Sequence, residues 1–240
     1  ALYDKPSVLI GRKGTIGKVK YVEHPFWTVD TLFYTIVNTD IVLPKYLYYV
    51  MSLMDLNNYN EGTTIPSLRT ETLNRLEFDI PSLVEQETIL SCLNPIDEKI
   101  ALNNAINNNL EQQAQAIFKS WFIDFEPFSN RKPSDWSLST LGNVSIMGAG
   151  GDKPQNVSPI KTDLYEYPIY SNGLSNEGLY GFTDKPKISE ESVTVSARGT
   201  IGFVCLRHIP YVPIVRLVTL IPKTEIVSAK YLYLWLKQLH

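Results

Sequence analysis

The stretch SVLIGRKGTIG, residues 7–17, has a counterpart in SVTVSARGTIG at residues 192–202, with six of the eleven residues identical. A shift of 185 residues aligns residues 7–51 with residues 192–236, and both copies end in a helix-like run that contains KYLY. In each copy, alternating apolar residues lead to a Gly-x-x-Gly turn, a second short strand and an apolar run at helical spacing. The pattern therefore predicts a duplicated, compact, strand-rich α+β domain.

The glycine-rich turn is not a nucleotide-binding P-loop. Five residues separate Gly11 from Gly17, where a P-loop has four, and Val19 stands where a magnesium-binding hydroxyl is needed. Glycines in a tight turn permit positive φ whatever the function of the loop. We therefore interpret four glycines as structural turn residues: Gly14, Gly17, Gly199 and Gly202.

Composition excludes several classes of protein. The 240 residues, 44% of them hydrophobic, can form one large or two ordinary globular domains. No apolar run is long enough to span a membrane, and the N-terminal residues show neither the basic n-region nor the apolar h-region of a signal peptide, so we expect a soluble, cytoplasmic protein. The two cysteines, Cys92 and Cys205, lie far apart, and the three histidines have no metal-binding spacing. We predict neither a disulfide framework nor a metal site.

Charge is distributed unevenly along the chain. Residues 84–128 carry seven acids and two bases, so this segment is net −5 and the remainder is net +2, although the whole chain is −3. Residues 5–22 hold five bases and no acid. A local basic strip attracts a polyanion whatever the total charge. A solvated hairpin face is the alternative interpretation of the same strip.

Between the two copies, apolar residues recur in heptads and predict a long amphipathic helix. We expect Pro95 to kink it or to start a new helix capped by Asn94, giving a short helix and then one of about 30 residues. Asparagines in the apolar columns would fix the register and number of partner helices. Packing on its own domain is the alternative for this helix. The predicted partner-facing residues, here called the seam, are Ile89, Leu93, Ile96, Ile100, Asn103, Asn107, Leu110, Ile117 and Trp121.

Four stretches together resemble the specificity subunit of type I restriction-modification enzymes. They are GTTIPSLRTETLNRLEFDIPSLVEQETI at residues 62–89, AIFKSWFIDFEPF at residues 116–128, YPIYSNGLSNEGLYGF at residues 167–182, and the paired turns. The resemblance implies strand-rich target-recognition domains joined by a long helical, coiled-coil conserved region. It divides the chain into part of a first recognition domain (1–82), a helical spacer and docking region (83–129) and part of a second recognition domain (130–240).

The resemblance also implies the function. In that family each recognition domain reads one half of a split target on double-stranded DNA, and methyltransferase subunits dock on the helical region, with a restriction subunit as a further partner where the system has one. The first copy has no counterpart of residues 136–191, and the second has none of residues 55–128, including the distal helical region. We therefore expect either a fragment of a longer chain or a chain completed by partner segments.

Base edges are read by Arg, Lys, Asn and Gln, and phosphate contacts fix the register of a protein on DNA. The glycine-rich GAGGDKP at residues 148–154 resembles a loop near the start of family recognition domains, while an S-adenosylmethionine loop would need a following helix that Lys153-Pro154 does not start. The predicted DNA-binding residues are Arg12, Lys13 and Lys18 in the first domain and Lys153, Ser171, Asn172 and Arg198 in the second.

We predict no catalytic residue and no cofactor in the chain itself. The Asn/Asp-Pro-Pro-aromatic motif of amino-methyltransferases is absent, so S-adenosylmethionine would be bound by the partner methyltransferase. The acidic Asp97-Glu98 pair is interpreted as a solvated helix face and not as a nuclease site. The alternative functions are a coiled-coil adaptor and a vestigial half-subunit that binds the methyltransferase without directing modification.

Overall fold

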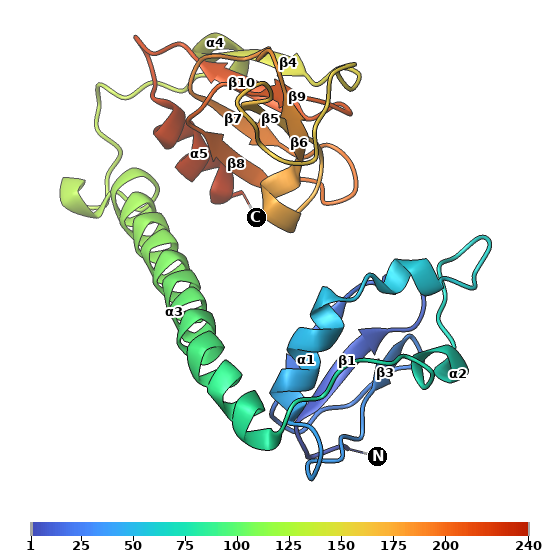
Figure 1. Cartoon of the computed structure of the whole chain (residues 1–240). Helices are drawn as coiled ribbons and strands as arrows, with labels where there is room; N and C mark the ends of the chain where they lie inside the picture. Colours follow the sequence, from blue (N-terminus) through green and yellow to red (C-terminus); the bar gives the residue numbers. More distant parts are fainter. Residues whose placement is uncertain (1, 240) are drawn as a thin grey trace. The chain divides into compact units, whose positions relative to one another are not determined.

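The computed structural model describes residues 2–239, which form two compact units that meet in the sequence between Ala105 and Ile106. The boundary lies inside α3 (Leu83–Phe122), a single helix of 40 residues (Figure 1). Each unit contains sheet and helix, so the α+β class predicted from the sequence is confirmed. Among the helices of residues 2–239, none has the length and apolar composition that a membrane crossing requires.

The first unit is built on a three-stranded antiparallel sheet of order β2-β1-β3. Helix α1 packs against β1 and β2. The core between them contains the apolar residues Val8, Ile10, Ile16, Val42, Leu47, Met51, Leu56 and Leu68. The elements are β1 (Ser7–Gly11), β2 (Val19–Val22), β3 (Leu32–Tyr34), α1 (Pro44–Leu53), the 3-10 helix η1 (Leu56–Tyr59) and α2 (Thr70–Leu73).

The second unit contains two sheets, of order β4-β10-β7-β8 and β6-β5-β9. Helix α5 packs against β7, β8 and β10. The first sheet contains β4 (Ser145–Ala149), β7 (Ser192–Val195), β8 (Val204–Arg207) and β10 (Val218–Pro222). The second contains β5 (Tyr167–Tyr170), β6 (Leu179–Thr183) and β9 (Val212–Pro213). The helices are η2 (Glu126–Phe128), α4 (Leu141–Val144), η3 (Ser175–Gly178) and α5 (Ala229–Lys237).

The two units repeat the same substructure in the same register, which confirms the duplication. Ser7 pairs with Val22 in the first unit, and Ser192 pairs with Arg207 in the second. Leu9 pairs with Tyr34, and Thr194 pairs with Thr219. All four positions, and the first residues of α1 and α5, are separated by the same 185 residues. The strand pair, the third strand and the helix are therefore two copies of one folding unit.

Helix α3 begins with a capping box that explains part of the motif IPSLVEQ. The carboxylate of Glu85 accepts hydrogen bonds from the Ser82 N–H (2.9 Å) and hydroxyl (2.7 Å), which lowers the pKa of Glu85. The next residue, Gln86, is fully buried. Its Oε1 accepts from the Leu43 N–H at 2.8 Å, and its Nε2 donates to the carbonyls of Ile41 and Pro81, each at 2.9 Å. The adjacent Glu and Gln thus start the helix and attach it to the first domain.

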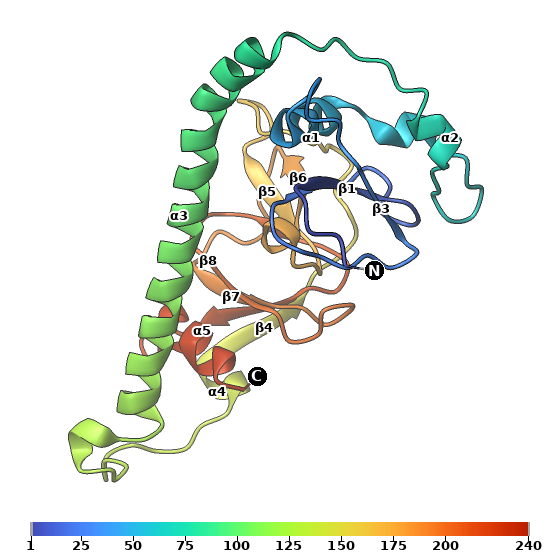
Figure 2. The same cartoon turned by 90° about the horizontal axis from the view of Figure 1, so that it is seen from below.

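The expected division into two helices at Pro95 was wrong, because α3 is one helix from Leu83 to Phe122 with Pro95 inside it. Figure 2 draws α3 as a single helix. A proline inside a helix removes one backbone hydrogen bond and crowds the preceding turn. Contacts on both sides of the proline offset this cost. Leu90 is buried on one side of Pro95, and Asp97 is bonded to α1 on the other.

Candidate nucleic-acid interface

Four loops of the second unit are joined by hydrogen bonds around one side chain, Asn172. Its Oδ1 accepts from the N–H of Ala197 at 2.8 Å, and its Nδ2 donates to the carbonyl of Val215 at 2.6 Å. The Val215 N–H in turn donates to the carbonyl of Gly151 at 2.9 Å. We call the four connected segments, residues 150–154, 171–174, 196–202 and 214–217, the loop cluster. The cluster contains Lys153, Ser171, Asn172 and Arg198, which the sequence placed in three separate motifs.

These four residues have different roles within the cluster. Ser171 and Asn172 are partly buried and bonded internally, Ser171 through its N–H and hydroxyl to the carbonyl of Gly178. Lys153 is exposed, with its Nζ 3.4 Å from the hydroxyl of Tyr180. Arg198 is exposed and forms no side-chain hydrogen bond or ion pair with any residue from 2 to 239. The exposed charges among the four are therefore those of Lys153, which contacts Tyr180, and Arg198, while Ser171 and Asn172 maintain the loops.

Sequence reasoning missed a second arginine in the loop cluster, Arg216. It is exposed and has φ of 63°, next to Val215 with φ of 52°. Lys187 adds a further positive charge beside the loop cluster. Its Nζ lies close to Gly151, 3.5 Å from the position that a Cβ on this glycine would occupy. No motif or repeat marks Arg216, since its counterpart in the first copy is Thr31. Only the pairing of distant loops reveals it.

A buried arginine holds the neighbouring loop, which contains the 3-10 helix η3. Arg207 is 3% exposed and donates to Glu177 Oε2 at 3.1 Å and to the Glu177 carbonyl at 2.7 Å. It also bonds Thr194 Oγ1 at 3.0 Å and stacks on Tyr170, with 3.7 Å between Cζ and the ring centroid. The carboxylate of Glu177 is thereby paired with a cation, which reduces its repulsion of an anionic ligand.

The corresponding turn of the first unit presents Lys13 and Lys18, both of which are exposed. Arg12 is partly buried. Its guanidinium donates to the Asp30 carbonyl at 3.2 Å and lies 5.4 Å from the Phe33 ring centroid. Arg12 therefore packs against its own domain, and the two lysines carry the charge that is available to a ligand.

Three of the four turn glycines adopt the positive φ expected of them: Gly14 at 79°, Gly199 at 68° and Gly202 at 87°. Gly17 does not, so the reason given for it was wrong. A Cβ at Gly17 would lie 2.8 Å from Asn57 Nδ2. Glycine at this position leaves room for the asparagine side chain instead of relieving backbone strain.

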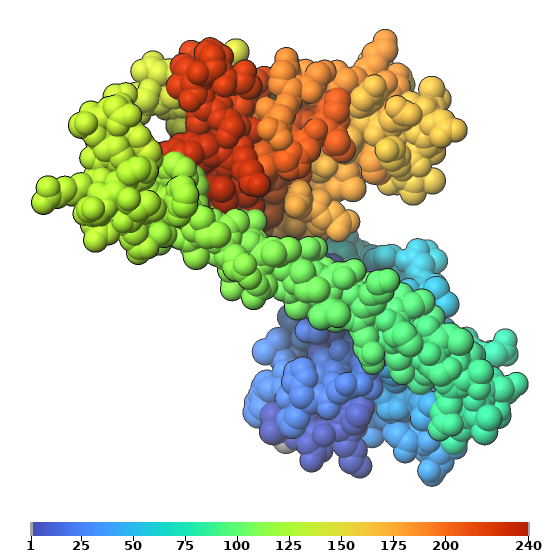
Figure 3. All heavy atoms as spheres, turned by 90° about the vertical axis from the view of Figure 1, so that its left-hand side faces the viewer, coloured from blue at the N-terminus to red at the C-terminus, as the bar shows by residue number. Residues whose placement is uncertain are grey.

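The seam of α3 is largely exposed. Ile96, Ile100, Leu110, Ile117 and Trp121 are between 50% and 60% exposed, and Ile89 is 40% exposed. Asn103 and Asn107 are exposed too, while Leu93 is partly buried. Figure 3 shows the atoms of α3 in green. The seam thus remains available to a partner.

In the first unit, α3 is attached to α1 through Asp97. Asp97 accepts a short hydrogen bond from the Tyr49 hydroxyl and pairs with Lys45 Nζ at 3.4 Å. Burial and the bond to Asp97 raise the pKa of Tyr49. The side chain of Asp97 is 42% exposed, so it is solvated in part, and its bond to Tyr49 is a contact that the interpretation as a solvated face did not include. The sequence alone does not show whether an acidic residue on a helix is hydrogen-bonded to water or to a tyrosine hydroxyl.

In the second unit, α3 is attached to α5 through Glu111. Its Oε1 accepts from the Tyr233 hydroxyl at 2.8 Å and lies 3.5 Å from Lys237 Nζ. Burial would raise the pKa of Glu111, but the bonds from Tyr233 and Gln115 and the charge of Lys237 outweigh it and lower the pKa. Burial and the bond to Glu111 raise the pKa of Tyr233. The two copies thus use the same chemistry at non-equivalent positions.

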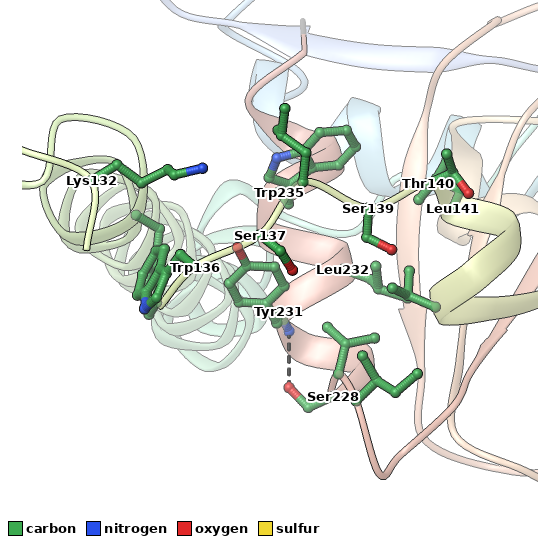
Figure 4. Close-up of a pocket in the computed structure, with 15 residues that line it drawn as sticks. Lys132, Trp136, Ser137, Ser139, Thr140, Leu141, Ser228, Tyr231, Leu232 and Trp235 are labelled. Atoms are coloured by element: carbon green, nitrogen blue, oxygen red, sulfur yellow. Dashed lines mark hydrogen bonds between the residues drawn. The ribbon is translucent and has the colours of Figure 1, made fainter. Parts of the chain in front are cut away.

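The motif FKSWFIDFEPF forms an aromatic cluster at the end of α3. Trp136 stacks on Phe122 with centroids 5.7 Å apart, and Phe118 meets Tyr231 at 5.2 Å. Beside it lies a pocket of about 600 Å³ whose lining includes Trp136, Tyr231 and Trp235. Figure 4 shows Tyr231 and Trp235 on α5, with the Tyr231 N–H bonded to Ser228. The lining is mainly apolar, and Lys132 and Tyr231 are among its polar side chains.

Comparison with known proteins gives consistent matches. The family model described as type I restriction modification DNA specificity domain matches residues 1–112 and 133–240. The type I restriction enzyme MjaIX specificity subunit of Methanocaldococcus jannaschii is 31% identical over 64% of this chain and 39% of that protein. The HindI specificity subunit of Haemophilus influenzae is 36% identical over 60% and 34%, respectively.

Solved structures give a weaker match. The S subunit of a type I restriction-modification system from M. genitalium has a TM-score of 0.48 and 20% identity, over 98% of this chain and 64% of that one. The chain therefore spans less than two thirds of the length of each of these three relatives.

Proposed function

Because the chain belongs to the type I restriction modification DNA specificity domain family, we propose that it is a DNA-sequence-recognition part of a type I restriction-modification complex. It would read a two-part target on double-stranded DNA and dock methyltransferase subunits. It would itself be non-catalytic. S-adenosylmethionine and the methyl transfer would belong to the methyltransferase, with a restriction subunit as a further partner where the system has one.

The observation that carries this proposal is the repeated domain with a basic turn in each copy. Lys13 and Arg198 occupy the same position of the two turns, 185 residues apart, and both are exposed. Exposed cations that make no internal ion pair release counterions when they meet phosphates, and this release drives DNA binding. A protein with two equivalent reading domains recognises two half-sites, as dimeric repressors do.

The acidic α3 supports partner docking. Its segment, residues 84–128, has a net charge of −5 and would be repelled by DNA, whereas its seam exposes large apolar side chains. Exposed apolar residues at heptad spacing fit a second helix in knobs-into-holes packing. We therefore assign DNA contact to the turns and the loop cluster, and protein contact to the seam.

The salt dependence of duplex binding tests the DNA assignment. We expect the affinity of the chain for a random-sequence duplex pool to fall linearly on a log–log plot with salt concentration. The double variant Lys13→Ala, Arg198→Ala should flatten the slope by roughly 2, since each lost phosphate contact removes about 0.9. The double variant should still bind the methyltransferase. If the double variant had the same salt slope as the parent, the two turns would not be part of the DNA interface.

The exposed seam also favours an alternative, in which the chain is a coiled-coil adaptor or a vestigial half-subunit that occupies the methyltransferase without directing modification. This alternative predicts methyltransferase binding together with little salt-dependent duplex binding. The same salt titration separates the two functions. Only the recognition function requires that the affinity of the parent chain for duplex DNA rise steeply as the salt concentration falls.

A further inference from the structure

The turn at residues 214–217 has a conformation that its residues do not favour. Val215 and Arg216 are consecutive non-glycine residues in the left-handed region, at φ of 52° and 63°. A β-branched residue is rare there because its Cβ meets the backbone. Such conformations persist only where surrounding contacts determine them, and they concentrate at functional sites.

Contacts from two sides hold this turn. The Val215 and Arg216 N–H groups donate to the carbonyls of Gly151 and Gly150, at 2.9 Å and 3.0 Å. A Cβ on Gly150 would lie 2.7 Å from the backbone nitrogen of Ile214, so only glycine permits the approach. From the other side, the Asn172 amide donates to the Val215 carbonyl at 2.6 Å.

Packing in the core does not explain why Val215 and Arg216 adopt this strained conformation, so a functional role is indicated. Val215 is 48% exposed and Arg216 is exposed, so neither contributes to the core. The Arg216 guanidinium forms no hydrogen bond or ion pair with residues 2–239. The exposed cations Lys153, Lys187 and Arg198 belong to the same cluster or border it, while Asp152 is the acid within it.

We propose that Arg216 contacts the DNA phosphate backbone and that Asn172 is its positioning residue. Asn172 was predicted to read bases, but its amide oxygen and nitrogen already connect the Arg198 turn to the Arg216 turn. Through the bond to the Val215 carbonyl it holds the backbone next to Arg216. This inference rests on the proposed function and adds to it a contact that neither the repeat nor the basic motifs indicate.

The test is a double-mutant cycle on duplex binding by the full chain, with a random-sequence duplex pool as the probe. Arg216→Ala should weaken binding at low salt about 5- to 10-fold and lower the salt slope by about 1. Arg131→Ala is the matched control, because Arg131 is exposed and lies outside the loop cluster. It should bind like the parent.

Asn172→Ala should weaken binding in the parent but have less than about a 2-fold further effect in the Arg216→Ala background, because its role is to position the arginine. A purely structural asparagine would lower stability equally in both backgrounds and give additive losses of affinity. Such additivity would overturn the positioning role, and parent-like binding by Arg216→Ala would overturn the contact. If the parent itself does not bind duplex, the proposed function fails first and this inference fails with it.

Discussion

Gln86 decides how firmly α3 is held to the first domain. It is fully buried and makes three hydrogen bonds to backbone groups, those of Leu43, Ile41 and Pro81. Each bond contributes about 0.5–1.5 kcal/mol, and losing it leaves a buried polar group without a partner. We expect Gln86→Met, which keeps the side-chain length, to lower the free energy of unfolding of the first unit by about 3 kcal/mol.

Urea denaturation followed by circular dichroism measures the loss, and hydrogen exchange of the Leu43 N–H assigns it to the first unit. Gln112→Met is the matched control, because Gln112 is exposed on the same helix. It should change stability by less than about 0.5 kcal/mol. If Gln86→Met were as stable as this control and the Leu43 N–H stayed protected, the three bonds would not hold the helix and the reasoning would be refuted.

Three further predictions follow from the packing of α3. The folded-state pKa of Tyr233 lies above its ordinary value of 10.0, so the stability that its hydroxyl contributes through Glu111 is fully present below pH 10 and declines as pH rises above it. Melting temperatures measured up to about pH 11 should fall less in Tyr233→Phe than in the parent, and should still fall in the variant because the pKa values of Tyr49 and Tyr211 are raised as well. Trp136→Ala should destabilise the second unit by about 2 kcal/mol in urea, less than a fully buried tryptophan would, because Trp136 is partly exposed. Ile96→Ser with Ile117→Ser should leave melting unchanged while reducing co-purification with the methyltransferase, and a drop in melting temperature would show that the seam packs within the chain.

Patterns that repeat along the chain predicted the structure well. The duplication is an alignment of identical residues, so it transferred directly to strand register, from Ser7–Val22 to Ser192–Arg207. The long helix follows from heptad spacing, and its seam is exposed as the partner hypothesis requires. The duplication and the long helix could be predicted because the repeat and the heptad spacing are both visible in one sequence.

Features that depend on tertiary contacts were not predictable. Pro95 has a strong local tendency to end a helix, but buried and bonded residues on both sides outweigh it. Asp97 and Glu111 look like solvent-facing acids until the tyrosines that bond them are placed beside them. Neither tyrosine is at a position equivalent to the other, so the repeat could not have indicated the contact.

The candidate site shows the same division. The exposed charges of Lys13 and Arg198 follow from the repeated turn, whereas Arg216 comes from a segment with no motif and is brought into the loop cluster by pairing with Gly150 and Gly151. Asn172 has the residue type of a base reader, but its amide is used inside the protein. Residue type predicts what a side chain can do, and only its partners decide whether it is free to do so.

A map of methylated adenines tests the central claim, that this chain directs modification to a DNA sequence, most directly. The map would be made in a host carrying the gene for this chain and the neighbouring methyltransferase, with and without the change Lys13→Ala, Arg198→Ala. We predict that a two-part motif is methylated with the unaltered gene and loses methylation with the variant, while the methyltransferase still co-purifies with both. An identical map for both genes would contradict the account and leave partner docking through α3 as the remaining function.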